Sequence, residues 1–114
     1  MQKDDGRILD IVLAASEIAD FIAGKTYDDY LKQPLLRSAV ERQVYVIGEA
    51  ARQLSEPFKT AHPGIPWVSI VGARNILAHE YGRVDHHILW EIATIHAPSL
   101  AGYLTPLVPP EIEE

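Results

Sequence analysis

The stretch PLLRSAVERQVYVIGEAARQL, residues 34–54, decides the fold. Its apolar residues recur at steps of three and four, the spacing that places side chains on one face of an α-helix. They are Leu36, Val40, Val44, Ile47, Ala51 and Leu54. Pro34 suits the first position of a helix, where its missing N–H has no bond to lose. The pattern therefore predicts a long helix over residues 34–54 with one face buried.

The other side of this predicted helix carries Arg42, Tyr45, Glu49 and Arg52, again at steps of three and four. One interpretation is a solvated face with ion pairs inside the helix, each contributing only a few tenths of a kcal/mol. The other is a polar wall that faces a functional segment elsewhere in the chain or a partner. Gly48, next to Glu49, allows another backbone to come close. The sequence leaves both interpretations open.

Toward the N-terminus, residues 5–23 show the same helical spacing of apolar residues. These residues are Ile8, Ile11, Val12, Ala15, Ile18, Ala19 and Ile22. Gly24 is suited to end the helix because glycine adopts the left-handed conformation without strain. Residues 26–33 then predict a connector with a single helical turn that exposes the phenols of Tyr27 and Tyr30.

Toward the C-terminus, residues 56–61 predict a short helical segment, and the turn HPGIP at residues 62–66 precedes a third long helix. We expect His62 to be a surface residue of this turn. The apolar side of the third helix consists of Trp67, Ile70, Val71, Leu77 and Ala78. Gly72 interrupts this side and allows either a bend or close packing.

A last helix begins after Asp85, whose carboxylate can cap its free backbone N–H groups. Its inward stripe is predicted to be Leu89, Ile92, Ala93, His96, Leu100 and Tyr103. Within this stripe we expect His96 to be a packing residue. Pro98 removes the hydrogen bond to the Thr94 carbonyl, so a kink is expected there.

Every periodic segment has the helical period, and no segment alternates in the manner of a strand. The sequence therefore predicts an all-α protein, an antiparallel bundle of four main helices with one or two short ones. A chain of 114 residues is expected to form one domain. We place the helical domain at residues 1–104 and a flexible tail rich in proline and glutamate at residues 105–114.

The composition excludes several classes of function. The chain has no cysteine, which removes disulfides, thiolate nucleophiles and cysteine-based zinc sites. The sequence shows no signal peptide, and no apolar run approaches the roughly 20 residues that a membrane span needs, so a cytoplasmic protein is expected. The net charge of -6 disfavours non-specific nucleic-acid binding. Any contact with RNA must therefore come from a local cluster of arginines.

The octet RNILAHEY, which begins at Arg74, brings a guanidinium, an imidazole and a phenol together. On a straight helix Arg74 and Tyr81 share a face, whereas His79 lies roughly 140° around from Arg74. Asn75 lies four residues before His79 and can support its ring. The three groups can therefore meet only if the helix distorts near Gly82 or if two copies of the chain share one site.

The residue types of the octet suit cleavage of RNA. Histidine titrates near neutral pH and can give or take a proton. Arginine presents a planar, permanently charged fork that suits phosphate oxygens. RNA carries its own nucleophile, the 2′-hydroxyl, so a base, an acid and charge stabilisation suffice without a metal or cofactor. Taken alone, the pattern is also compatible with structural capping or packing.

The spacing of Arg74, His79 and Tyr81 matches R-x4-H-x-Y, the signature of HEPN-domain toxins of the HepT type, which this sequence resembles. Other segments resemble that family in the same order and at similar spacing. They are Pro34-Leu35-Leu36-Arg37, Ile47-Gly48-Glu49-Ala50-Ala51, His62-Pro63, Ile65-Pro66-Trp67 and Trp90-Glu91. The resemblance covers residues 5–104, nearly the whole chain.

This resemblance implies a homodimer that acts as a metal-independent endoribonuclease, the toxin of a type VII toxin–antitoxin system. It implies that Arg74 and His79 are catalytic. The implied partner is a minimal nucleotidyltransferase antitoxin that transfers AMP to Tyr81. A bulky anion there would occupy the phosphate pocket and neutralise Arg74. We expect Tyr81 and Asn75 to position the phosphate in the absence of this modification.

An alternative function is a non-catalytic helical dimer that binds a nucleotidyltransferase as a regulatory or scaffold subunit. His86, His87 and Glu91 have the chemistry of metal ligands but no metal-site spacing, so we expect surface residues and no metal site. Glu80 is either solvated or a third catalytic group. The role of Glu49 is unassigned.

Overall fold

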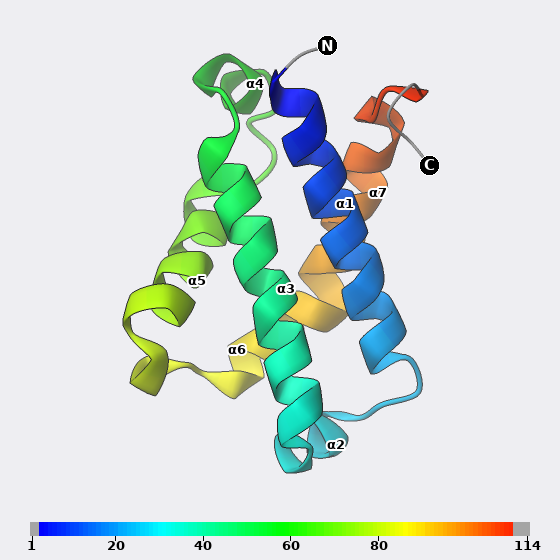
Figure 1. Ribbon diagram of the computed structural model, residues 1–114, viewed down its shortest axis with the longest axis vertical. Coiled ribbons are helices and arrows are strands. Elements are labelled where there is room, and N and C mark those ends of the chain that lie inside the picture. Colours follow the sequence, from blue (N-terminus) through cyan, green and yellow to red (C-terminus); the bar gives the residue numbers. More distant parts are fainter. Residues whose placement is uncertain (1–2, 111–114) are drawn as a thin grey trace.

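A computed structural model describes residues 3–110, with the exception of the Tyr81 side chain, and this part of the chain contains helices and no strand. Its four antiparallel rods are α1 (Lys3–Ile22), α3 (Pro34–Gln53), α5 (Trp67–His79) and a C-terminal rod of α6 (His86–Glu91), η2 (Ile92–His96) and α7 (Ala97–Leu104) (Figure 1). The short elements are α2 (Tyr27–Lys32), α4 (Glu56–Ala61), η1 (Tyr81–Arg83) and η3 (Thr105–Leu107). The prediction of an all-α antiparallel bundle is confirmed.

Helix α3 is the central rod, with α1 along one side and α5 along the other (Figure 1). Pro34 is its first residue, and the predicted stripe from Leu36 to Leu54 is buried throughout. Helix α1 buries a matching face against it, made of Ile8, Ile11, Ala14, Ala15 and Ile18. The two longest helices therefore form the main hydrophobic contact of the molecule, as their apolar periodicity predicts.

The connection from α1 to α3 contains one error of prediction. Gly24 has a φ of 72°, the left-handed conformation that was expected there. Helix α2, however, starts at a capping box formed by Thr26 and Asp29 and turns Tyr30 into the core. Tyr30 is fully buried, and its ring centroid lies 5.4 Å from that of Trp90. The expectation of an exposed Tyr30 phenol was wrong because a residue four positions before the start of a long helix was treated as part of a loop.

The C-terminal rod differs from the kinked helix that Pro98 predicted. Residues Ile92–His96 form a π-helix, and the Ala97 N–H donates to the Ile92 carbonyl. A π-turn holds more residues than an α-turn, so the side chains that follow it are rotated about the axis. The buried residues after it are therefore Ala97, Leu100, Leu104 and Val108, whereas His96 and Tyr103 are exposed. The expectation that His96 packs in the core was wrong.

The chain remains packed beyond the end of α7. Residues Thr105–Leu107 form a 3-10 turn, and Val108 is buried against the core. Residues 111–114 lie outside the described part, so the division of the chain after residue 104 stays a prediction. No helix in residues 3–110 combines the length and apolar character needed to cross a membrane.

Helix α5 is less buried than α1. None of its residues is fully buried, and Val68 is 89% exposed. The helix runs without a break through Gly72, where an added Cβ atom would meet nothing within 4 Å. Gly72 therefore produces neither the bend nor the close packing that was considered from sequence. This partly exposed helix carries most of the octet.

Candidate active site on helix α5

Arg74 lies where α5 comes closest to α3. A Cβ atom added to Gly48 would be 2.2 Å from the Arg74 Cβ atom and 3.0 Å from the Ile70 carbonyl oxygen. Only a residue without a side chain permits this approach. The first carbon of the Arg74 side chain therefore rests directly on the α3 backbone, which directs the rest of the side chain along α3.

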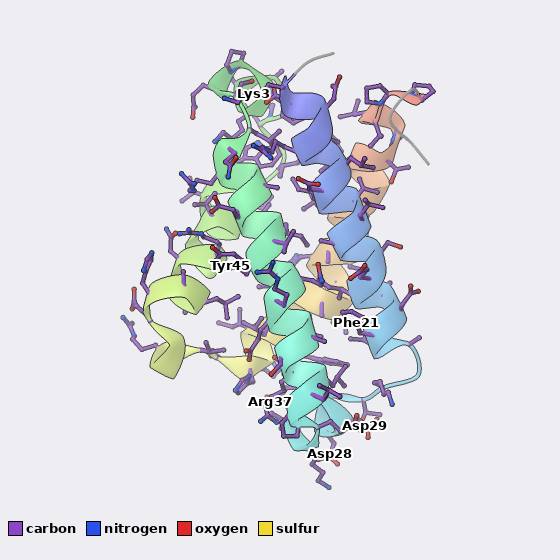
Figure 2. All side chains as sticks on the ribbon, in the orientation of Figure 1. Lys3, Phe21, Asp28, Asp29, Arg37 and Tyr45 are labelled. Atoms are coloured by element: carbon purple, nitrogen blue, oxygen red, sulfur yellow. The ribbon has the colours of Figure 1, made fainter. Side chains whose placement is uncertain are left out.

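The Arg74 guanidinium is held by groups from both helices. Its Nε atom lies 3.0 Å from Glu49 Oε1, and its Nη1 atom donates to Asn75 Oδ1 at 2.9 Å. Its Cζ atom stands 5.3 Å from the centre of the Tyr45 ring, within the range of a cation–π contact. In Figure 2 Tyr45 is labelled on the side of α3 that faces α5. The Arg74 side chain is 16% exposed, so the site holds it firmly yet leaves it open to solvent.

The Glu49 carboxylate interacts with two cations of this region, Arg52 and Arg74. Arg52 donates to both carboxylate oxygens, at 3.1 and 2.7 Å, and Gln53 donates to Oε2 at 2.6 Å. The pKa of Glu49 is lowered from 4.5 to about 2. The largest cause is hydrogen bonding by Arg52, followed by the hydrogen bond from Gln53 and by the charges of Arg52 and Arg74. Both interpretations of the polar side of α3 thus hold in part. Glu49 forms a pair inside its helix and also faces the octet.

His79 is the last residue of α5 and is exposed to solvent. Asn75, one turn earlier, is also exposed, but its side-chain oxygen accepts from Arg74. Among the described residues no hydrogen bond joins Asn75 to the His79 ring, as the helical spacing had suggested, and none joins His79 to Arg74. The described part of one chain therefore does not bring the two predicted catalytic groups into contact.

The end of the octet leaves the helical path. The backbone at Glu80 has φ -134° and ψ 46°, and the 3-10 turn η1 follows from Tyr81 to Arg83. Glu80 forms an ion pair with Arg83 across this turn and is exposed. The side chain of Tyr81 lies outside the described residues, so its predicted roles remain predictions. The helix ends only after His79, so the distortion considered near Gly82 does not turn His79 toward Arg74.

A shallow recess of about 270 Å³ lies between α3 and α5. Its lining consists of Ser38, Glu41, Arg42, Tyr45, Leu77 and Ala78. Neither Arg74 nor His79 lines the recess, but Tyr45 does, and the Tyr45 ring also contacts Arg74. Arg42 is exposed and its Cζ atom lies 5.8 Å from the centre of the Tyr45 ring, the same ring that contacts Arg74. Two guanidinium groups therefore contact one aromatic ring, with the carboxylates of Glu41 and Glu49 nearby.

A second hollow, an apolar groove of about 800 Å³, lies between α5 and the C-terminal rod. Ile70 and Ile76 line one side, and Ile88, Ile92 and Leu100 line the other. Arg74 and His79 are not among its lining residues. The groove is therefore not part of the candidate active site.

Three other histidines, His62, His86 and His87, contact side chains of the bundle. His86 Nδ1 lies 3.7 Å from Glu41 Oε2 and 3.4 Å from the Tyr30 hydroxyl oxygen, and the His87 ring packs edge-on against Tyr27. The predicted surface position of His62 is only partly correct. The His62 ring is half-buried, and its Nδ1 atom lies 2.6 Å from the Tyr103 hydroxyl oxygen. No group of three or more metal-ligating side chains occurs among the described residues.

Comparison with known proteins decides the family. A family model described as "Ribonuclease HepT-like" matches residues 11–107, most of the chain. The chain belongs to the HepT-like ribonuclease family. The resemblance noted from the R-x4-H-x-Y spacing is therefore confirmed by a match that extends far beyond the octet.

Curated relatives of this HepT-like chain carry related names. "Probable ribonuclease HepT" of Thermococcus cleftensis is 36% identical over 93 residues, which cover 82% of this chain and 84% of the relative. "Putative RNase MJ1380" of Methanocaldococcus jannaschii is 33% identical over 93 residues, which cover 82% of this chain and 85% of the relative. No solved structure gives a significant match. The two relatives are matched over nearly the whole helical bundle.

Sequence reasoning did not identify the partners of Arg74 in this HepT-like site. Tyr45 and Glu49 were seen as one polar face of α3, but nothing in the sequence showed which helix would cover it. The signal that could have paired the two helices is Gly48, which sits between Tyr45 and Glu49 on that face. A glycine inside a long helix is unfavourable for the helix itself, so it indicates a close approach by another segment.

Proposed function

We propose that this protein is an endoribonuclease that cleaves RNA without a metal ion, with Arg74 and His79 as its catalytic residues. The observation that carries the proposal is the set of contacts that hold the Arg74 guanidinium. A guanidinium is fixed at its Nε edge by Glu49 and on its face by Tyr45, one turn before an exposed histidine on the same helix. Membership of the HepT-like ribonuclease family supports the same function.

The proposed chemistry uses the 2′-hydroxyl of RNA as the nucleophile. An imidazole takes the proton of the 2′-hydroxyl while its oxygen forms a bond to the phosphorus. The bond from phosphorus to the 5′-oxygen breaks, and that oxygen receives a proton from a general acid. The products are a 2′,3′-cyclic phosphate and a 5′-hydroxyl. His79 transfers protons, and Arg74 stabilises the charge that develops on the phosphate oxygens.

We infer that two copies of the chain build one cleft. Within the described part of one chain Arg74 and His79 are not joined by any contact, and a single histidine cannot act as base and acid at the same moment. A homodimer with a two-fold axis through the cleft would supply two imidazoles and two guanidiniums. The additional arginines would also offset the net charge of -6 at the place where RNA binds.

We further propose that this protein is the toxin of a type VII toxin–antitoxin pair. A minimal nucleotidyltransferase would add AMP to the Tyr81 hydroxyl, with release of pyrophosphate from ATP. Tyr81 begins the turn directly after the helix that carries Arg74 and His79. A phosphate group attached there would compete with RNA for the same cations.

The direct test is RNA cleavage by wild type and His79→Ala in the presence of EDTA, with the ends of the products identified. We expect wild type to keep its rate in EDTA and to leave a 2′,3′-cyclic phosphate and a 5′-hydroxyl. We expect His79→Ala to be slower by roughly 10²-fold or more. Equal rates for the two proteins, or loss of wild-type cleavage on chelation, would reject the histidine mechanism.

The alternative function, a non-catalytic dimer that binds a nucleotidyltransferase, makes a different prediction in cells. Expression of a ribonuclease should arrest growth, and Arg74→Ala should relieve the arrest. A scaffold subunit should be harmless yet bind the neighbouring nucleotidyltransferase tightly. Intact mass of the chain after expression with and without that enzyme would show whether Tyr81 gains AMP.

A further inference from the structure

Three donor atoms hydrogen-bond the Glu49 carboxylate, and a fourth nitrogen lies beside it as an ion-pair partner. Arg52 uses Nε and Nη2, Gln53 uses Nε2, and Arg74 presents its Nε atom at 3.0 Å. Arg52 and Gln53 come from the same helix as Glu49, so they fix the carboxylate before any other element is considered. Arg74 is the one member of this set that belongs to α5. The carboxylate therefore links a rigid part of α3 to the cation of the candidate active site.

The backbone leaves Arg74 little choice of direction. Its Cβ atom lies against Gly48, so the side chain must run along α3 toward either Glu49 or the recess beyond it. Its Nε atom is buried and makes no hydrogen bond, so the Glu49 carboxylate at 3.0 Å compensates it through charge alone. An arginine stem has several rotatable bonds, and holding it in one geometry costs conformational entropy. A fixed carboxylate beside Nε reduces the number of conformations that the Arg74 side chain samples in the free protein.

We propose that Glu49 is a positioning residue that aims the terminal edge of Arg74 at the scissile phosphate, an inference that rests on the ribonuclease function proposed above. With Glu49 at Nε and Tyr45 under the face, the edge formed by Nη1 and Nη2 is the part of the guanidinium turned to the substrate. That edge can pair with two phosphate oxygens at once. Asn75, which accepts from Nη1, fixes the same edge from the side of α5.

The electrostatics of Glu49 fit a role through Arg74 and not a proton-transfer role of its own. The hydrogen bonds from Arg52 and Gln53 hold the pKa of Glu49 at about 2, so it stays ionised throughout the range in which a histidine titrates. A carboxylate of this kind is a poor general acid at neutral pH. Its charge instead keeps Arg74 in place at every pH at which the enzyme would work.

The test compares Glu49→Gln with a matched control, Glu56→Gln, in steady-state cleavage of one RNA. Glu49→Gln keeps the shape but removes the charge that holds Arg74, so we expect kcat to fall roughly 10- to 100-fold with KM within about threefold of wild type. Glu56 belongs to α4, its side chain is 86% exposed and its ion pair is with Lys59, so Glu56→Gln removes a carboxylate charge without affecting the contacts of Glu49 or Arg74. We expect its kcat to stay within about threefold of wild type. Thermal unfolding of each variant checks that it is folded.

A double-mutant cycle shows whether Glu49 acts through Arg74. On an Arg74→Lys background, we expect Glu49→Gln to change kcat by less than about twofold, because the group that Glu49 positions is already gone. A fall equal to that seen in the wild-type background would overturn the proposal, since Glu49 would then act on its own. Glu49→Asp, which keeps the charge but withdraws it from Arg74, should give an intermediate kcat.

The outcomes separate this inference from the function on which it rests. If wild type does not cleave RNA at all, the proposed function fails, whatever Glu49 does. If wild type cleaves RNA and folded Glu49→Gln retains full kcat, the ribonuclease function stands and the positioning role is wrong. If Glu49→Gln and Glu56→Gln lose the same activity, the loss does not depend on the contact with Arg74 and the positioning role is again wrong.

Discussion

Helices α1 and α5 both pack on α3, yet they use that contact differently. Helix α1 buries five residues, all aliphatic, and its exposed face carries no candidate catalytic group. Helix α5 buries none fully. Its partly buried apolar residues, such as Ile70 and Leu77, pack against the core, and around Gly48 a guanidinium, a carboxylate and an aromatic ring add polar contacts with α3. One side of the central helix thus provides the hydrophobic stability, and the other side positions polar groups at the surface.

The difference shows how a small bundle can hold a paired guanidinium without weakening its core. Burying an unpaired arginine would be costly, since a buried charge needs a partner. Here Arg74 is paired with Glu49 at the edge of the bundle, so the core beneath remains aliphatic. The cost is a helix with few buried apolar contacts, which makes α5 the part of the molecule expected to open most readily.

The largest expected effect sets the same substitution in the two helices side by side. Ile11 of α1 is fully buried, so Ile11→Ala removes packed methyl and methylene groups and should lower the free energy of unfolding by about 2–5 kcal/mol. Ile76 of α5 is 39% exposed, and Ile76→Ala should cost about 1 kcal/mol or less. Urea unfolding followed by circular dichroism measures both. Similar losses would remove the contrast between the helices.

The next effect concerns the contact between α3 and α5. Gly48→Ala places a methyl group 2.2 Å from the Arg74 Cβ atom, so α5 must shift, and we expect a loss of about 1–3 kcal/mol in unfolding free energy. Gly72→Ala is the matched control. The new methyl group would meet nothing within 4 Å, so alanine should stabilise α5 by roughly 0.5–1 kcal/mol. Opposite signs at the two glycines are the result that supports a contact centred on Gly48.

The smallest expected effect is a pH dependence of stability at Glu49. Its folded-state pKa of about 2 lies below the ordinary 4.5, so the folded state favours the ionised carboxylate. The resulting stabilisation is fully present above pH 4.5 and is lost as the pH falls from 4.5 toward 2. The difference in urea midpoint between wild type and Glu49→Gln should therefore be full at pH 6 and smaller at pH 3, with the decrease beginning only below about pH 4.5.

A surface carboxylate serves as the control for this pH dependence. The side chain of Glu56 is 86% exposed and its ion pair with Lys59 is long, at 3.5 Å, so Glu56→Gln should change the midpoint little at either pH. A constant difference for Glu49→Gln across the same range would show that its ion pairs do not depend on folding.

The bundle could be predicted from sequence because its long helices have strong apolar periodicity. The stripe of α3 and most of that of α1 are buried as expected, and Gly24 and Asp85 act at helix ends as expected. The errors fall where periodicity gives no guidance. Tyr30 lies on a helix too short to show a period, and the π-helix before Ala97 shifts the pattern without any sequence signal other than the nearby Pro98.

The candidate site could be predicted only in part. Residue chemistry and family spacing made Arg74 and His79 candidates, but the helix continues through His79 and the two side chains do not meet within one chain. The Arg74–Glu49 pair could not be predicted, because helical spacing describes faces within one helix and not which face another helix covers. The expected support of His79 by Asn75 failed for a related reason. The Asn75 side-chain oxygen accepts a hydrogen bond from Arg74 instead.

Measuring RNA cleavage and unfolding free energy on the same preparation of His79→Ala tests the division between α1 and α5 most directly. His79 is exposed at the end of α5, so we predict a cleavage rate at least about 10²-fold below wild type. The unfolding free energy should stay within about 0.5 kcal/mol of wild type. An unchanged rate, or a loss of rate accompanied by a loss of stability comparable to that of Ile11→Ala, would contradict this division between α1 and α5.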